Sequence, residues 1–190
     1  MRLRNYCRFL LFLCLLFSAL CSSAQEVVHA LTGTVLSINS KTKTMLVKQD
    51  DGTEGVFRLP TKQDGSLDFD RNVKADTTPA AAFTKMKTQA LIYYIGFDMN
   101  RTVIAVQDLG PAPLVKVLGP VVRFNKHRHL LTVQNASGAE VTFQVDDKTV
   151  AETPGGVVEA DKFDPQKGDD LRIVALSSPG TAKALFIRVE

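Results

Sequence analysis

The chain contains an internal repeat that covers most of its length. Aligned without gaps, residues 31–59 match residues 117–145, which lie 86 positions further on. The identical pairs are Gly33/Gly119, Val35/Val121, Asn39/Asn125, Val47/Val133, Gly52/Gly138, Glu54/Glu140 and Phe57/Phe143. Downstream, Phe83, Lys87 and Leu91 align with Phe163, Lys167 and Leu171, and residues 103–106 align with residues 184–187. A period of about 80 residues is too long for the units of a solenoid and predicts two complete small domains.

Each copy has the pattern of a β-domain. The strands expected in the first copy are residues 31–38, 45–47, 56–59, 91–97 and 102–106, and the second copy repeats this plan. Asp50-Asp51-Gly52 predicts a hairpin, because glycine allows the positive φ that tight hairpins require. Residues 79–87 and 159–164 each predict a short helix ahead of the fourth strand. We therefore expect an all-β chain of two tandem, small, five-stranded OB-like barrels, each with a short helix before strand four.

The N-terminus has the pattern of a secretory signal peptide. Arg2, Arg4 and Arg8 precede a twelve-residue apolar run, which falls short of the roughly 20 residues that span a membrane. Small residues then lead to the bond between Ala24 and Gln25, where we expect signal cleavage. A retained N-terminal anchor is the alternative. Cleavage would remove residues 1–24 and leave an exported protein in the periplasm or outside the cell, without a stable membrane span.

The leader also holds every cysteine of the chain, Cys7, Cys14 and Cys21. The mature protein would then contain no thiol, which excludes disulfides, cysteine nucleophiles and cysteine metal sites. Cleavage before a lipid-modified Cys21 is a second alternative, although the bulky Leu20 stands where lipoprotein signals have a small residue.

The charge of the mature chain argues against nucleic acid as a partner. Of 23 basic and 20 acidic residues, the leader takes three arginines and no acid, which leaves 20 of each. No dense Lys/Arg cluster remains, so the counterion release that drives phosphate binding would be small.

Proline and glycine mark the boundary between the two copies. Gly110 is followed by Pro111-Ala112-Pro113, which predicts a stiff, extended linker. We place the first OB-like domain at residues 25–110, the linker at 111–113 and the second OB-like domain at 114–190.

The repeat resembles a large family of uncharacterised bacterial exported OB-like domains. The similarity lies in Gly33-x-Val35-x-x-Ile38, the hairpin and the later strands, and the second copy is the better match. It has Gly119-x-Val121, Lys167-Gly168-Asp169 ahead of strand four, and Ala184 in strand five. The first copy departs from the pattern, with Lys87-Thr88-Gln89 in place of Gly-Asp and a longer loop before its helix. The resemblance implies fold and export, and it carries no catalytic residue over to this chain.

Two histidines are candidate metal ligands. His127 and His129 would share one face if the stretch is extended, and an exported pair of this kind could take copper or zinc. Two ligands do not complete a site, however, and the aligned residues of the first copy are Lys41 and Lys43. We expect a polar turn at this place and no cofactor or metal in the protein.

Two further features of the first copy are candidate binding elements. Tyr93 and Tyr94 lie next to each other in the fourth strand, so one ring is expected to point outward, where an OB-like barrel could offer it to a ligand. The loop Pro60–Thr78 is long for a compact domain. Its aspartates do not follow the order of a calcium loop, so we interpret it as solvated.

No enzyme signature is present in the sequence. There is no Gly-x-Ser-x-Gly elbow, phosphate loop, His-Glu-x-x-His or dinucleotide fingerprint. The sequence therefore favours an exported, non-catalytic binding or interaction module for a protein or glycan partner. A copper- or zinc-binding protein that uses His127 and His129 is the alternative, and an enzyme of unrecognised type is a second one.

Overall fold

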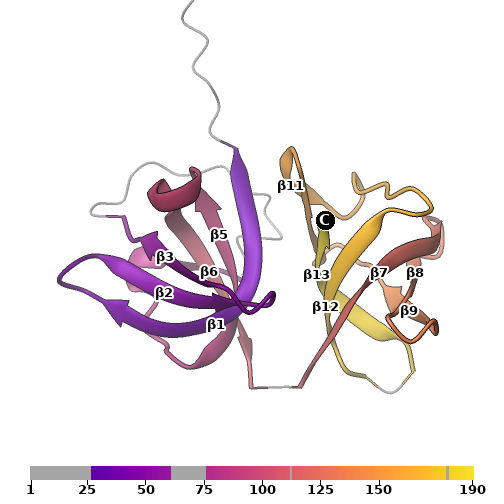
Figure 1. Cartoon of the computed structure of the whole chain (residues 1–190), viewed down its shortest axis with the longest axis horizontal. Coiled ribbons are helices and arrows are strands. Elements are labelled where there is room, and N and C mark those ends of the chain that lie inside the picture. Colours follow the sequence, from indigo (N-terminus) through magenta and orange to yellow (C-terminus); the bar gives the residue numbers. More distant parts are fainter. Residues whose placement is uncertain (1–26, 61–75, 112, 179) are drawn as a thin grey trace, which may run out of the picture.

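The computed structural model describes residues 27–60, 76–111, 113–178 and 180–190. Over these residues the chain is almost entirely β, and its strands form two separate sheets that each close on themselves. Figure 1 shows the two barrels side by side, the first with its long strand β1 (Val28–Asn39) on the side that faces the second. The expected all-β architecture of two tandem OB-like barrels is confirmed.

The first barrel has the strand order β3-β2-β1-β5-β6. Besides β1 it contains β2 (Thr44–Gln49), β3 (Glu54–Arg58), β5 (Thr88–Ile95) and β6 (Thr102–Gly110). A parallel pairing of Arg58 with Thr102 joins β3 to β6 and closes the ring. Two short elements, β4 (Thr78–Pro79) and the 3₁₀ turn η1 (Ala80–Ala82), lie before β5, and η2 (Asp98–Asn100) connects β5 to β6.

The second barrel repeats this order as β9-β8-β7-β12-β13. Its strands are β7 (Leu114–Asn125), β8 (Leu130–Gln134), β9 (Glu140–Gln144), β12 (Asp170–Leu176) and β13 (Ala182–Val189). Parallel pairing of β13 with β9 closes the ring. The hairpin of β10 (Val150–Thr153) and β11 (Gly156–Glu159) extends the sheet beyond β13.

The short helix expected before strand four differs between the copies. In the first barrel it is a single 3₁₀ turn, η1. In the second, residues 159–164, expected to be helical, form only a turn, in which the backbone nitrogens of Lys162 and Phe163 donate to the carbonyl of Glu159, so that part of the prediction is wrong. The residues just before this turn form the β10–β11 hairpin, where valines at positions 150, 157 and 158 favour extended backbone and Gly156 has the φ of 102° that a hairpin end accommodates.

The internal repeat is visible in the backbone of the turns and bulges. Lys43 and His129, which align in the repeat, have φ values of 52° and 54°. A β-carbon on either of the aligned glycines, Gly33 or Gly119, would collide with a carbonyl of the neighbouring strand. Glycine is therefore required at both places because the two strands approach too closely for a side chain.

One part of the repeat alignment is wrong by a single residue. In the structure Gly33 pairs with Ala90, whereas its equivalent Gly119 pairs with Leu171. Ala90, and not Leu91, is therefore the counterpart of Leu171. Because successive strand residues point to opposite faces, the slip changes the environment: Leu171 lies inside its barrel, and Leu91 lies on the outside of the first.

Three apolar clusters hold the molecule together, one inside each barrel and a third between the barrels. Phe57 and Phe143, equivalent in the repeat, are fully buried in the first and second cores. The third, which we call the inter-barrel cluster, combines Ala30, Leu91, Tyr93 and Ala105 of the first barrel with Val150, Val174 and Phe186 of the second. These side chains are buried because the barrels pack on each other. Among the described residues, no helix is long and apolar enough to cross a membrane.

Candidate functional site

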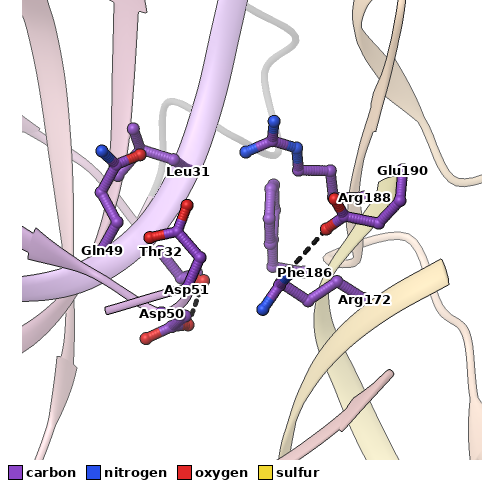
Figure 2. A pocket seen from close by; sticks show the side chains of 9 residues that line it. All are labelled: Leu31, Thr32, Gln49, Asp50, Asp51, Arg172, Phe186, Arg188 and Glu190. Atoms are coloured by element: carbon purple, nitrogen blue, oxygen red, sulfur yellow. Dashed lines mark hydrogen bonds and ion pairs between the residues drawn. The ribbon is translucent and has the colours of Figure 1, made fainter. Parts of the chain in front are cut away.

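A small cleft opens between the two barrels beside the inter-barrel cluster. The first barrel contributes Leu31, Thr32, Gln49, Asp50 and Asp51. The second contributes Arg172, Phe186, Arg188 and Glu190. Figure 2 shows the acidic hairpin of the first barrel facing the two arginines of the second across the gap. The cleft volume is about 30 Å³, enough for about two water molecules, and its charged walls are partly open to solvent.

The first-barrel wall is held rigid by short-range hydrogen bonds of the β2–β3 hairpin. The carboxylate of Asp51 accepts hydrogen bonds from the backbone nitrogen of Thr53 at 2.8 Å and from its hydroxyl at 2.6 Å. Asp50, directly before it, accepts a hydrogen bond from Thr32 at 2.5 Å and forms an ion pair with Lys116 at 2.6 Å. The side chain of Asp50 is only 5% exposed, so this residue ties the hairpin to β1 and to β7.

The second-barrel wall is a pair of neighbouring arginines. Arg172 and Arg188 are direct partners on the antiparallel strands β12 and β13. Like charges in such a pair repel each other unless an acid compensates them. Glu190 accepts a hydrogen bond from the Nε of Arg172 at 2.6 Å. Arg188 makes no hydrogen bond or ion pair with the described part of the chain, and its guanidinium points toward the first barrel (Figure 2).

The charges on the two walls act on each other through space. The pKa of Asp51 is lowered, first by the hydrogen bonds from Thr53 and then by the positive charge of Arg172 and Arg188. Asp51 is therefore ionised at neutral pH. No arginine nitrogen lies within 4.0 Å of it among the described residues, so the attraction does not amount to an ion pair.

Next to the cleft, a buried hydrogen-bonded group joins the barrels. The Nδ1 of His29 lies 2.7 Å from a carboxylate oxygen of Glu152, and the backbone nitrogen of Ala30 donates to the other oxygen at 2.9 Å. Burial raises the pKa of Glu152, while the hydrogen bonds from His29 and Ala30 act in the opposite direction. Glu152 belongs to the β10–β11 hairpin, so this hairpin contributes directly to the docking of the barrels.

The two tyrosines do not offer an exposed ring. Tyr93 does leave the interior of its own barrel, but the second barrel covers it and its exposure is 0%. Tyr94 is half-buried and packs against the first core. Its ring contacts His29 at 5.6 Å and Phe57 at 5.5 Å between centroids. The expectation of one outward, accessible tyrosine is wrong, because the second barrel covers the outward ring.

The two candidate metal ligands lie on an exposed turn. His127 and His129 belong to the turn between β7 and β8. Over the described residues there is no group of three or more His, Cys, Asp or Glu side chains arranged to hold a metal ion.

Several predicted features lie outside the described residues. These are the signal-cleavage residues Ala24 and Gln25, the lipidation candidate Cys21, and most of the loop Pro60–Thr78. The end of that loop is described, and there Asp76 is 3.3 Å from the Nζ of Lys148 in the second barrel.

The sequence analysis missed Asp51, Arg172 and Arg188 as site residues. In the sequence, Asp51 has only the pattern of a hairpin residue, next to Gly52. The available signal was the pair of arginines at outward positions of the last two strands of the second copy. With the corrected alignment, Leu91 of the first copy is equivalent to Arg172 of the second. A comparison of the two copies therefore marks Arg172 as a charged residue where the repeat otherwise has an apolar one.

Comparison with known proteins adds little to this geometry. No protein-family model matches the chain, and no curated protein matches it. A solved structure described as "Crystal structure of Ag(I)CusF" is similar over 41% of this chain and 99% of its own length, at 12% identity and a TM-score of 0.33. This likeness says nothing about the ligand of the present protein, and the resemblance to exported OB-like domains stays a prediction.

Proposed function

We propose that the protein is an exported, non-catalytic binding module whose ligand site is the inter-barrel cleft. The observation that carries the proposal is the pair of opposite charges, Asp51 and Arg188, that face the cleft from different barrels without bonding to each other. Charged groups that are held in place but not paired with each other can still form hydrogen bonds and ion pairs with a ligand.

A binding role is favoured over catalysis by the chemistry of the cleft. Among the described residues that line the cleft, a hydroxyl donates to a carboxylate where Thr32 bonds to Asp50. Thr32 is 3% exposed, and the other Asp50 oxygen is occupied by Lys116. A nucleophile must reach its substrate, so this pair serves to hold the hairpin in place.

Export is supported by the basic start, the short apolar run and the small residues before Gln25. Intact-mass measurement of the protein recovered from the exported fraction tests it. The mature chain is expected to begin at Gln25. A chain that begins at a lipid-modified Cys21, or one that keeps its leader, would contradict cleavage at this site.

The ligand site is tested by NMR with the isotope-labelled mature protein. Small molecules, oligosaccharides and peptides recovered from the exported fraction are added to it, and the amide signals are followed. Signals of Thr32, Asp51 and Arg188 should shift together, while those of the distant turn at His127 should not. Shifts confined to other surfaces, or turnover of an added compound, would contradict the proposal.

A further inference from the structure

Within the described part of the chain, the side-chain charges that line the inter-barrel cleft are paired except for two. Asp50 is neutralised by Lys116 at 2.6 Å, and Glu190 by Arg172 at 2.6 Å. What remains is one carboxylate, Asp51, on the first barrel and one guanidinium, Arg188, on the second. The unpaired charge of the cleft is therefore one negative and one positive group on opposite walls, with a net charge of zero.

Both remaining groups have hydrogen-bonding capacity left. Asp51 uses one oxygen for Thr53, and its second oxygen accepts no hydrogen bond from the described residues. Arg188 donates to no described residue, although a guanidinium has five donor hydrogens. Asp51 is exposed and Arg188 is half-buried, so solvent screens part of any contact they make, and both groups are accessible to a ligand from outside.

This arrangement discriminates between classes of small ligand. A simple anion such as phosphate would be attracted by Arg188 but repelled by Asp51 and Glu190. A simple cation would be attracted by Asp51 but repelled by Arg172 and Arg188. A ligand with an ammonium at one end and a carboxylate at the other satisfies both walls at once.

We infer that the inter-barrel cleft binds a small zwitterion of the amino-acid type, its ammonium on Asp51 and its carboxylate on Arg188. This inference rests on the proposed function and names the chemistry of its ligand. Arg188 lies between two acids of the interface, Asp51 across the cleft and Glu152, its neighbour on β10. The carboxylate of the ligand binds to the side of the guanidinium that faces the cleft. The small, partly open cleft predicts weak affinity, with a dissociation constant of about 0.1–1 mM.

The test uses glycine and two analogues that each lack one charge, N-acetylglycine and glycinamide. They are titrated into the labelled mature protein at constant ionic strength, and the shifts of Asp51 and Arg188 signals are fitted. Glycine is expected to bind at least fivefold more tightly than either analogue. Equal responses to all three compounds would mean that no paired recognition occurs, and would overturn the inference.

Two charge-neutralising variants assign the ends of the ligand. Asp51→Asn keeps an oxygen for Thr53 and should abolish the preference for glycine over N-acetylglycine. Arg188→Gln should abolish the preference for glycine over glycinamide. Arg123→Gln, which changes an arginine of the second barrel outside the cleft, should change neither preference. A variant of Asp51 or Arg188 that keeps wild-type discrimination overturns the inference, and either one alone is sufficient if the other does not fold.

The experiment separates this inference from the proposed function. If the cleft signals respond to an exported compound that is not a zwitterion and ignore glycine, the inference is wrong and the binding module stands. If they respond to no compound of any class, both are wrong. Strong coupling between Asp51→Asn and Arg188→Gln in the stability of the ligand-free protein would show that the two residues simply bond to each other, and would also overturn the inference.

Discussion

His29 of the first barrel and Glu152 of the second, 123 positions apart in the chain, share a partly buried hydrogen bond of 2.7 Å. Glu152 also accepts the backbone N–H of Ala30, so one carboxylate satisfies two groups of the opposite barrel. The Nε2 of His29 is buried without a hydrogen-bond partner among the described residues. The pairing of His29 with Glu152 therefore ties β1 to β10 where the two barrels meet.

Glu152→Gln should remove a pH-dependent loss of stability. Burial raises the pKa of Glu152 above its ordinary value of 4.5. A raised carboxyl pKa means that the folded state holds the proton more tightly, so the stability due to this group is full below about pH 4.5 and falls as the pH rises through the folded pKa. In urea unfolding between pH 4.5 and 7, the free energy of unfolding of Glu152→Gln should therefore increase relative to that of the wild type as the pH rises.

The matched control for this measurement is Glu159→Gln in the same hairpin, whose side chain is 37% exposed. The free energy of unfolding of Glu159→Gln relative to the wild type should not increase as the pH rises from 4.5 to 7. If the difference in free energy of unfolding between Glu152→Gln and the wild type is the same at every pH, burial does not destabilise the ionised form of Glu152.

The barrel fold could be predicted from the sequence because local signals and the repeat agree. Gly33 and Gly119 mark the same close strand approach, and Gly52 and Gly138 end the same hairpin with φ of 89° and 83°. The alignment of the fourth strand failed by one residue because Leu91 and Leu171 are both apolar. An outward leucine looks like a core residue when a second barrel covers it.

The site could not be predicted in the same way, because it is created by the packing of one barrel on the other. Asp51 has an ordinary role in its own hairpin, and Arg188 is an ordinary outward residue in its own strand. Only the docking of β1 against β10, β11 and β13 brings their walls together. The burial of Tyr93 has the same origin, which is why reasoning about one copy at a time predicted an exposed ring.

The second barrel, residues 114–190, should unfold cooperatively when it is expressed alone. It has its own apolar core, with Phe143, Leu171 and Ile187 at 0% exposure. The isolated barrel would, however, expose Val174 and Phe186 of the inter-barrel cluster, so we also expect self-association. Urea unfolding and sedimentation measure both, and Phe186→Ser should reduce the association. A molten, non-cooperative fragment would mean that the two barrels form one folding unit.

Lys87→Gly should stabilise the protein by about 0.5–1 kcal/mol, since an L-residue in left-handed backbone costs more than the added flexibility of glycine. Lys87 is exposed and has φ 58°, and the second copy has Gly168, with φ 95°, at the equivalent place. Both backbone nitrogens donate to matching carbonyls, of Val35 and Val121. Gly168→Lys is the reverse control and should destabilise by about 1 kcal/mol. Thermal unfolding of both variants measures the difference; the same sign for both would contradict the backbone explanation.

His129→Lys should change the stability by less than about 0.5 kcal/mol, because Lys43 occupies the equivalent turn with almost the same φ, 52° against 54°. The carbonyls of Lys43 and His129 also accept equivalent hydrogen bonds, from Leu59 and Val145, each at 2.8 Å. The turn therefore needs the backbone conformation and not the imidazole.

The same turn should not bind copper or zinc more tightly than about micromolar, because two histidines leave half of a tetrahedral shell to water. Lys126 and Arg128 flank the histidines and add positive charge, which opposes a divalent cation. Titration calorimetry of the mature protein with each metal measures the affinity, and His127→Ala is the matched variant. A one-to-one, submicromolar isotherm that His127→Ala abolishes would show that the turn is a metal site, and that the binding chemistry of this protein lies at the β7–β8 turn rather than between its barrels.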